Sequence, residues 1–150
     1  MNQLFVKGKF QLTAFNWASD AVDIGVLLME NDFVFDETDN AVSQVVAAGT
    51  EATGTGYARK IIEAADRHVV EEDLITKTAQ LSIFDGNVIW SALDAGTDLR
   101  VILFFVTGTD VDDDSNLLLG YYDTGTNVPI NSGGADVQLN FNTLGAIQYN

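Results

Sequence analysis

The sequence predicts a mainly β protein, an antiparallel β-sandwich or barrel-like sheet that carries one short α-helix. The first observation is Leu99–Val106, LRVILFFV, which is almost continuously apolar and rich in Val, Ile and Phe. Such a run is typical of a strand that is buried on both faces. The second observation is that short apolar segments alternate with turns about every ten residues, as in sandwiches and barrels. The third is that one segment, about Asn40–Ala48, is the best helix candidate in the chain.

The beginning of the chain gives a mixed signal. Met1–Trp17 fits either a short helix or an irregular strand, and Gly8 disfavours a long helix. Ala21–Met29 follows with the alternation of a strand, because every second residue of a strand points to the same face. We therefore expect residues 1–15 to form an N-terminal arm, and residues 16–150 to form a single β-rich domain.

The predicted helix at about Asn40–Ala48 has recognisable ends. Asp36 or Thr38 is expected to cap its start, and Gly49 to end it. Its apolar face would consist of Val42, Val45 and Val46. The Gly-rich residues Gly49–Gly56 are expected to form a flexible loop after it.

Turn residues separate the remaining predicted strands. These strands are Tyr57–Ala64, His68–Glu71, Ala79–Phe84, Val88–Ser91, Arg100–Val106, Leu117–Asp123, Asp136–Phe141 and Ala146–Tyr149. With the single helix laid against them, they indicate one sheet-based domain, which is the usual outcome for a chain of this length.

Composition narrows the classes of function. The chain has 22 acidic residues against 7 Lys and Arg, for a formal net charge of −15, and it has no cysteine. Nucleic-acid binding depends on Lys and Arg that neutralise phosphates, so no nucleic acid and no anionic membrane is expected as a partner. Disulfides and thiolate metal sites are excluded. The start of the sequence has no signal-peptide pattern, so synthesis is expected in the cytoplasm.

No motif predicts catalysis or a cofactor. His68 is the only histidine, and a Ser-His-Asp triad would have to use it. Asp110, Asp112 and Asp114 alternate like the first three ligands of a calcium loop. The sixth and twelfth positions of that loop are Ser115 and Tyr121 instead of glycine and glutamate. The three aspartates are therefore only a weak candidate for a looser metal site, and we expect the protein not to be an enzyme.

Aromatic residues leave a carbohydrate-binding module as a less favoured alternative. Trp17 and Trp90 are candidates for a ligand platform, although packing in a core or an interface explains them better. Tyr121 and Tyr122 are adjacent in a predicted strand, so they should point to opposite faces and cannot form one platform.

The order of short motifs along the chain resembles a family of small virion structural proteins of tailed bacteriophages. The motifs that carry this resemblance are NWASDAVDIGVLLM (16–29), GTGYAR (54–59), VIWSALDAG (88–96), LLLGYYDTG (117–125), GGADVQLNFN (133–142) and GAIQY (145–149). They span nearly the whole chain. Phe104–Ser115 departs from the family pattern and is interpreted as a partner-specific loop.

The resemblance implies a capsid decoration (cement) protein that binds the major capsid protein on the outside of the head. It also implies location in the virion and self-association as a dimer or trimer. A tail, adaptor or fibre-associated subunit is the alternative within the same virion.

Two segments are candidates for binding the partner. The N-terminal candidates are Leu4, Phe5, Lys7, Lys9 and Phe10. The loop candidates are Thr53, Thr55 and Tyr57. An apolar N-terminal segment with two lysines and no acid is able to add to a neighbour's sheet edge or to lie in a groove. The alternative is that this segment completes the core of its own chain.

Overall fold

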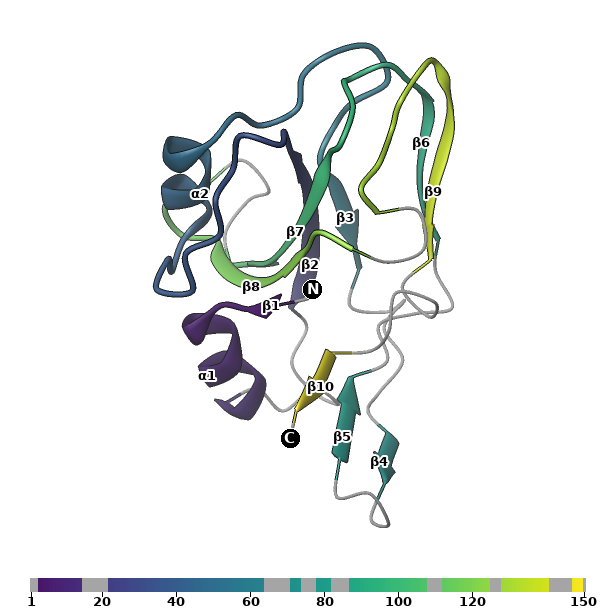
Figure 1. Cartoon of the computed structure of the whole chain (residues 1–150). Helices are drawn as coiled ribbons and strands as arrows, with labels where there is room; N and C mark the ends of the chain where they lie inside the picture. Colours follow the sequence, from purple (N-terminus) through teal and green to yellow (C-terminus); the bar gives the residue numbers. More distant parts are fainter. Residues whose placement is uncertain are drawn as a thin grey trace.

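The protein is built around an antiparallel five-stranded sheet (Figure 1), as seen in a computed structural model. The structure describes residues 3–14, 22–63, 71–73, 78–81, 87–107, 112–124, 128–140 and 147–149. The five-stranded sheet has the order β1-β8-β7-β2-β3. A three-stranded sheet has the order β10-β5-β4, and β6 and β9 form a two-stranded ribbon.

The described elements follow the chain in this order: β1 (Gln3–Leu4), α1 (Val6–Ala14), β2 (Asp23–Met29), α2 (Val42–Ala48), β3 (Lys60–Ile62), β4 (Glu71–Asp73), β5 (Thr78–Leu81), β6 (Asn87–Leu93), β7 (Arg100–Val106), β8 (Leu117–Tyr122), β9 (Ala135–Asn140) and β10 (Ile147–Tyr149). Every pairing between these strands is antiparallel. The predicted mainly β, antiparallel fold is confirmed, and the described strands do not close into a barrel.

The two central strands, β2 and β7, are buried on both faces. Every residue from Val101 to Phe105 on β7 is fully buried. On β2, every residue from Ile24 to Met29 is buried. Successive side chains of a strand point to opposite faces, so a strand covered on both sides needs an unbroken apolar run. The prediction drawn from LRVILFFV is therefore confirmed.

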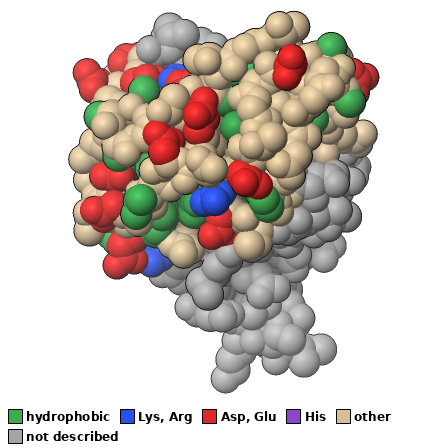
Figure 2. All heavy atoms as spheres, turned by 45° about the horizontal axis from the view of Figure 1, so that its top comes forward, with side chains coloured by type: hydrophobic (Ala, Val, Ile, Leu, Met, Phe, Trp, Pro, Cys, Tyr) green, Lys and Arg blue, Asp and Glu red, His purple; other side chains and the backbone are tan. Residues whose placement is uncertain are grey.

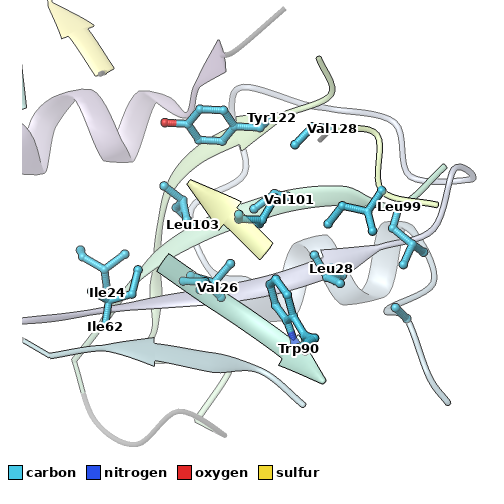
Figure 3. Packing of buried hydrophobic residues seen from close by; sticks show 14 of the residues in the cluster. Ile24, Val26, Leu28, Ile62, Trp90, Leu99, Val101, Leu103, Tyr122 and Val128 are labelled. Carbon is cyan, nitrogen blue, oxygen red and sulfur yellow. The ribbon is translucent and has the colours of Figure 1, made fainter. Parts of the chain in front are cut away.

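One face of the five-stranded sheet packs against the β6–β9 ribbon (Figure 3). This core contains Val26 and Leu28 from β2, Val101 and Leu103 from β7, and Trp90 from β6. The Trp90 side chain is fully buried, and its indole N–H donates to the carbonyl oxygen of Ala58 at 2.8 Å. Trp90 is thus a core residue and not a ligand platform. The sheet and the ribbon form the two layers of a sandwich.

The other face of the sheet is covered by α2, by the segment after β2 and by the start of the chain. Val42 and Val45 of α2 pack with Phe33, Phe5 and Leu118 in this second core. The two cores lie on opposite sides of the same strands, which explains why β2 and β7 are buried on both faces.

The α2 helix begins at Val42, two residues later than predicted, and the expected caps do not cap it. The Asp36 carboxylate instead accepts from the backbone N–H and the hydroxyl of Thr38, at 2.8 and 2.7 Å, and closes its own turn. The Gln44 side chain reaches back to the N–H groups of Asn40 and Ala41, at 2.7 and 3.1 Å. The helix ends at Gly49 as predicted.

A second helix, α1, adds to the single helix of the predicted fold, and of the two alternatives open for Met1–Trp17 it is the short helix that forms. Gly8, which disfavours a long helix, lies within this nine-residue helix. A Cβ on Gly8 would lie 2.2 Å from the carbonyl oxygen of Leu119 on β8. Only glycine allows the helix to approach the sheet this closely, so Gly8 is required by the packing of α1.

Several strand bounds differ from the prediction. β3 covers only Lys60–Ile62, because Tyr57 and Arg59 are tied into a loop described below. β6 extends to Leu93, beyond the predicted Val88–Ser91. β4 begins at Glu71, and the earlier part of the predicted strand from His68 lies outside the described residues.

Candidate interaction surface

Exposed apolar side chains gather on α1 and on the segment that follows β2. Val6 and Phe10, one turn apart on α1, are 49% and 61% exposed, and Val34 is 77% exposed. Beside them lies a shallow hollow of about 630 Å³. Its lining residues are Gln3, Val34, Phe35, Asp36, Glu37, Asp39 and Ala48. We call this hollow, together with Val6, Lys7, Lys9 and Phe10 of α1, the N-terminal patch.

Two contacts join α1 to the hollow. The Val6 N–H donates to the carbonyl oxygen of Glu37 at 2.9 Å, and the Lys9 ammonium lies 3.6 Å from the Glu37 carboxylate. The helix and the hollow therefore form one continuous surface. The ion pair is exposed and adds little to folding stability.

The hollow rests on a packed aromatic cluster. The Phe35 ring stacks on Tyr121 with centroids 5.2 Å apart, and it contacts Phe5 at 4.8 Å. Phe33 meets Tyr121 edge-on at 5.6 Å, and the Tyr121 hydroxyl accepts from Arg100 at 3.1 Å. A surface on such a base is held in shape before any partner binds, which lowers the entropic cost of binding.

The hollow is acidic. The hydrogen bonds from Thr38 hold the pKa of Asp36 below its usual value, so that Asp36 is charged at neutral pH. Partial burial raises the pKa of Asp39, and the negative charge of Asp36 raises it further. A cation brought to this rim by a partner would relieve that repulsion.

The N-terminal candidate residues divide into two groups in the structure. Phe5 is fully buried and Leu4 is half-buried in β1, where it packs against the first core. Phe5 therefore follows the alternative left open by the sequence, because it completes this chain's own core and is not available to a partner. Lys9 and Phe10 are exposed on α1, and the Lys7 ammonium lies 5.5 Å from the centre of the Phe10 ring.

The loop candidates also divide. Thr53 and Thr55 are exposed, whereas the Tyr57 hydroxyl donates to Glu51 at 2.7 Å and accepts from the Leu28 N–H at 3.2 Å. Tyr57 thus holds the loop to β2. The Thr55 carbonyl oxygen accepts from the Asp94 N–H at 2.8 Å, which anchors the tip of the loop as well.

Arg59 forms a cluster that the sequence did not reveal. Its guanidinium bonds both Glu51 carboxylate oxygens, at 2.8 and 2.6 Å, and also pairs with Asp113. These interactions raise the pKa of Arg59 further above its already high value. Asp113 and Arg59 are 54 positions apart in the chain. No local pattern signals a contact over that separation.

The weak metal candidate is only partly described. Asp110 lies outside the described residues, while Asp112 and Asp114 are exposed at the turn before β8. Within the part of the chain that the structure describes, no three His, Cys, Asp or Glu side chains are grouped to hold a metal ion. His68 and Trp17 also lie outside the described residues.

Tyr121 and Tyr122 confirm the expected division between faces. Tyr121 belongs to the core under α2, and Tyr122 belongs to the core under the β6–β9 ribbon. Both side chains are 3% exposed, so neither supplies a surface for stacking a sugar ring. Burial raises the pKa of Tyr122 above its usual value.

Figure 2 shows acidic side chains spread across the described part of one face, with few basic ones among them. Among the described helices, none has the length and apolar character to cross a membrane. Comparisons with family models, curated proteins and solved structures give no match for this chain.

Proposed function

We propose that this protein is a structural component of the virion of a tailed bacteriophage, a decoration protein that binds the major capsid protein on the outside of the head. The support from the sequence is the resemblance in the order of motifs from Asn16 to Tyr149. The structure adds an exposed and uncharged loop tip between α2 and β3, which a partner can reach.

The acidic surface is compatible with this role. A decoration protein lies outside the shell and does not meet the packaged DNA, so a net charge of −15 does not oppose its function. It acts by binding the assembled shell more tightly than the separate capsid subunits, which stabilises the shell by mass action. Repeated copies on the shell allow each contact to be modest.

We assign the contact with the shell to the tip of the loop between α2 and β3. Residues 52–58 carry no charge in a strongly acidic chain, and Thr53 and Thr55 are exposed there. Figure 1 shows this loop at the top of the molecule, away from α1 at the lower left. Gly56 is fixed against β6, since a Cβ on it would lie 2.5 Å from the Ser91 carbonyl oxygen. The tip therefore presents an uncharged surface and is anchored to the region of β6.

A density map of purified particles tests the function. Density for this protein over the capsomers is the expected result, and density confined to the portal, tail or fibres would replace the proposal by the tail or adaptor alternative. Shells that lack the protein should also release DNA at a lower temperature than decorated shells. Equal heat resistance would contradict a cementing role.

Binding of variants to undecorated shells tests the assigned contact. Thr53→Trp places a bulky side chain at the loop tip and should abolish cosedimentation with shells. Ile89→Trp is the matched control, because Ile89 is 46% exposed on the β6–β9 ribbon and outside the loop. Full binding by Thr53→Trp would show that the shell contacts another surface.

A further inference from the structure

We propose that the N-terminal patch is the interface of a symmetric dimer, in which α1 of each copy lies in the hollow of the other. The hollow and the helix are neighbours on one surface, as the Val6 and Lys9 contacts with Glu37 show. A two-fold axis beside them places α1 of each copy against the hollow of the other copy. Such an isologous contact requires one patch that is complementary to itself.

Charge is the first complementary feature. The described α1 sequence VKGKFQLTA has two lysines and no acid, whereas the hollow has Asp36, Glu37 and Asp39 on its rim. Lys9 already pairs with Glu37 of its own chain, while the repulsion between Asp36 and Asp39 persists. In the dimer, Lys7 of one copy reaches this acidic pair in the other. Complementary charges of this kind fix the orientation of two partners.

Apolar surface is the second complementary feature. Val6 and Phe10 stand on the convex helix, and Val34 together with half-buried Phe35 lines the concave hollow. Water is displaced from both surfaces when the helix enters the hollow, which supplies the favourable free energy of association. Aromatic side chains at the centre of a contact commonly contribute most of that free energy.

The net charge of the chain favours this dimer over other contacts between two copies. Two copies, each with a charge of −15, repel each other when acidic faces meet. Elsewhere in the described chain, Arg59 is engaged by Glu51 and Asp113, and Arg100 donates to Tyr121. Lys60 is on β3, and it does not line the hollow. The N-terminal patch combines lysines, acids and exposed apolar side chains in one place, which is what a self-complementary contact needs.

Exchange of charges between two variants tests the proposal with the purified full-length chain alone. Variant A carries Lys7→Glu and Lys9→Glu, and variant B carries Asp36→Lys and Asp39→Lys. Sedimentation should show a dimer for the unaltered protein and a dimer dissociation constant raised about tenfold or more for A and for B separately. An equimolar mixture of A and B should regain the dimer, because each helix then faces a hollow of opposite charge.

Circular dichroism of A and B checks that both variants are folded. Recovery of the dimer in the mixture is independent evidence that they are folded. Ile89→Glu, on the β6–β9 ribbon, is the control and should leave the dimer unchanged. A monomer at every concentration, a dimer unaffected in A and B, or no recovery in the mixture would each overturn the proposal. The sedimentation experiment uses no shells. A result that contradicts the dimer therefore leaves the proposed role in the virion untouched, and the reverse also holds.

Discussion

β7 and the beginning of the chain are both rich in large apolar side chains, but they use them differently. From Val101 to Phe105 every side chain of β7 is fully buried. In the first elements, Phe5 is fully buried while Val6 and Phe10 are about half exposed or more. The comparison teaches that an unbroken apolar run reveals two-sided burial, whereas a mixed segment does not reveal which residues face the core.

The largest expected effect tests whether the N-terminal residues belong to the core in the way β7 does. Phe5→Ala and Phe104→Ala should each lower the free energy of unfolding by about 3–5 kcal/mol, because both leave a cavity in a packed core. Phe10→Ala should change it by less than about 0.5 kcal/mol, because Phe10 is at the surface. Urea denaturation measures all three. If Phe5→Ala lowered the free energy of unfolding as little as Phe10→Ala does, Phe5 would not be part of the core.

The next effect tests the close approach of α1 to β8. Gly8→Ala should lower the free energy of unfolding by about 1–3 kcal/mol, because its Cβ overlaps the Leu119 carbonyl. Gly133→Ala is the control, since a Cβ there meets nothing within 4 Å. Thermal unfolding of the two variants gives the difference. If Gly8→Ala stabilised the protein, as its higher helix propensity alone would predict, the packing of α1 described above would be wrong.

A comparable or smaller effect is expected at the Arg59 cluster, which joins the loop after α2 to the turn before β8. Arg59→Met should lower the free energy of unfolding by about 1–3 kcal/mol, because it leaves the Glu51 and Asp113 carboxylates without their common cation. Lys60→Met, the adjacent residue on β3, is the matched control. Equal urea midpoints for the two variants would show that the ion pairs contribute nothing measurable.

The smallest effect is an alkaline loss of stability from the buried tyrosines. The pKa values of Tyr57 and Tyr122 are raised by burial, and that of Tyr57 also by its hydrogen bond to Glu51. Their contribution is complete below the unfolded pKa of about 10, and it is lost as the pH rises above it. The slope should be at most about 1.4 kcal/mol per pH unit for each tyrosine.

Urea titrations across this alkaline range measure that slope, and Tyr57→Phe should make it shallower. An unchanged slope in Tyr57→Phe would mean that Tyr57 ionises equally in the folded and unfolded chains. Thr53→Ala is the control, because Thr53 is exposed and has no group that titrates in this range, so the slope should not change.

The candidate surface was only partly foreseeable from the chain. The lysines and Phe10 stand out in the sequence because a segment with bases and no acids is unusual in an acidic protein. The hollow was not foreseen, because its acids follow β2 and meet α1 only after folding. The same holds for the Arg59 cluster, whose partners are 8 and 54 positions away.

The sequence by itself determined the mainly β class, the two-sided burial of β7 and the opposite faces of Tyr121 and Tyr122. These properties follow from the alternation of side chains along one strand, which is local. Only the tertiary structure decided that Gly8 sits within a helix and that Phe5 is buried beside exposed Phe10. The physical reason is that burial and close approach depend on what lies opposite, and β8 reaches α1 from more than a hundred residues along the chain.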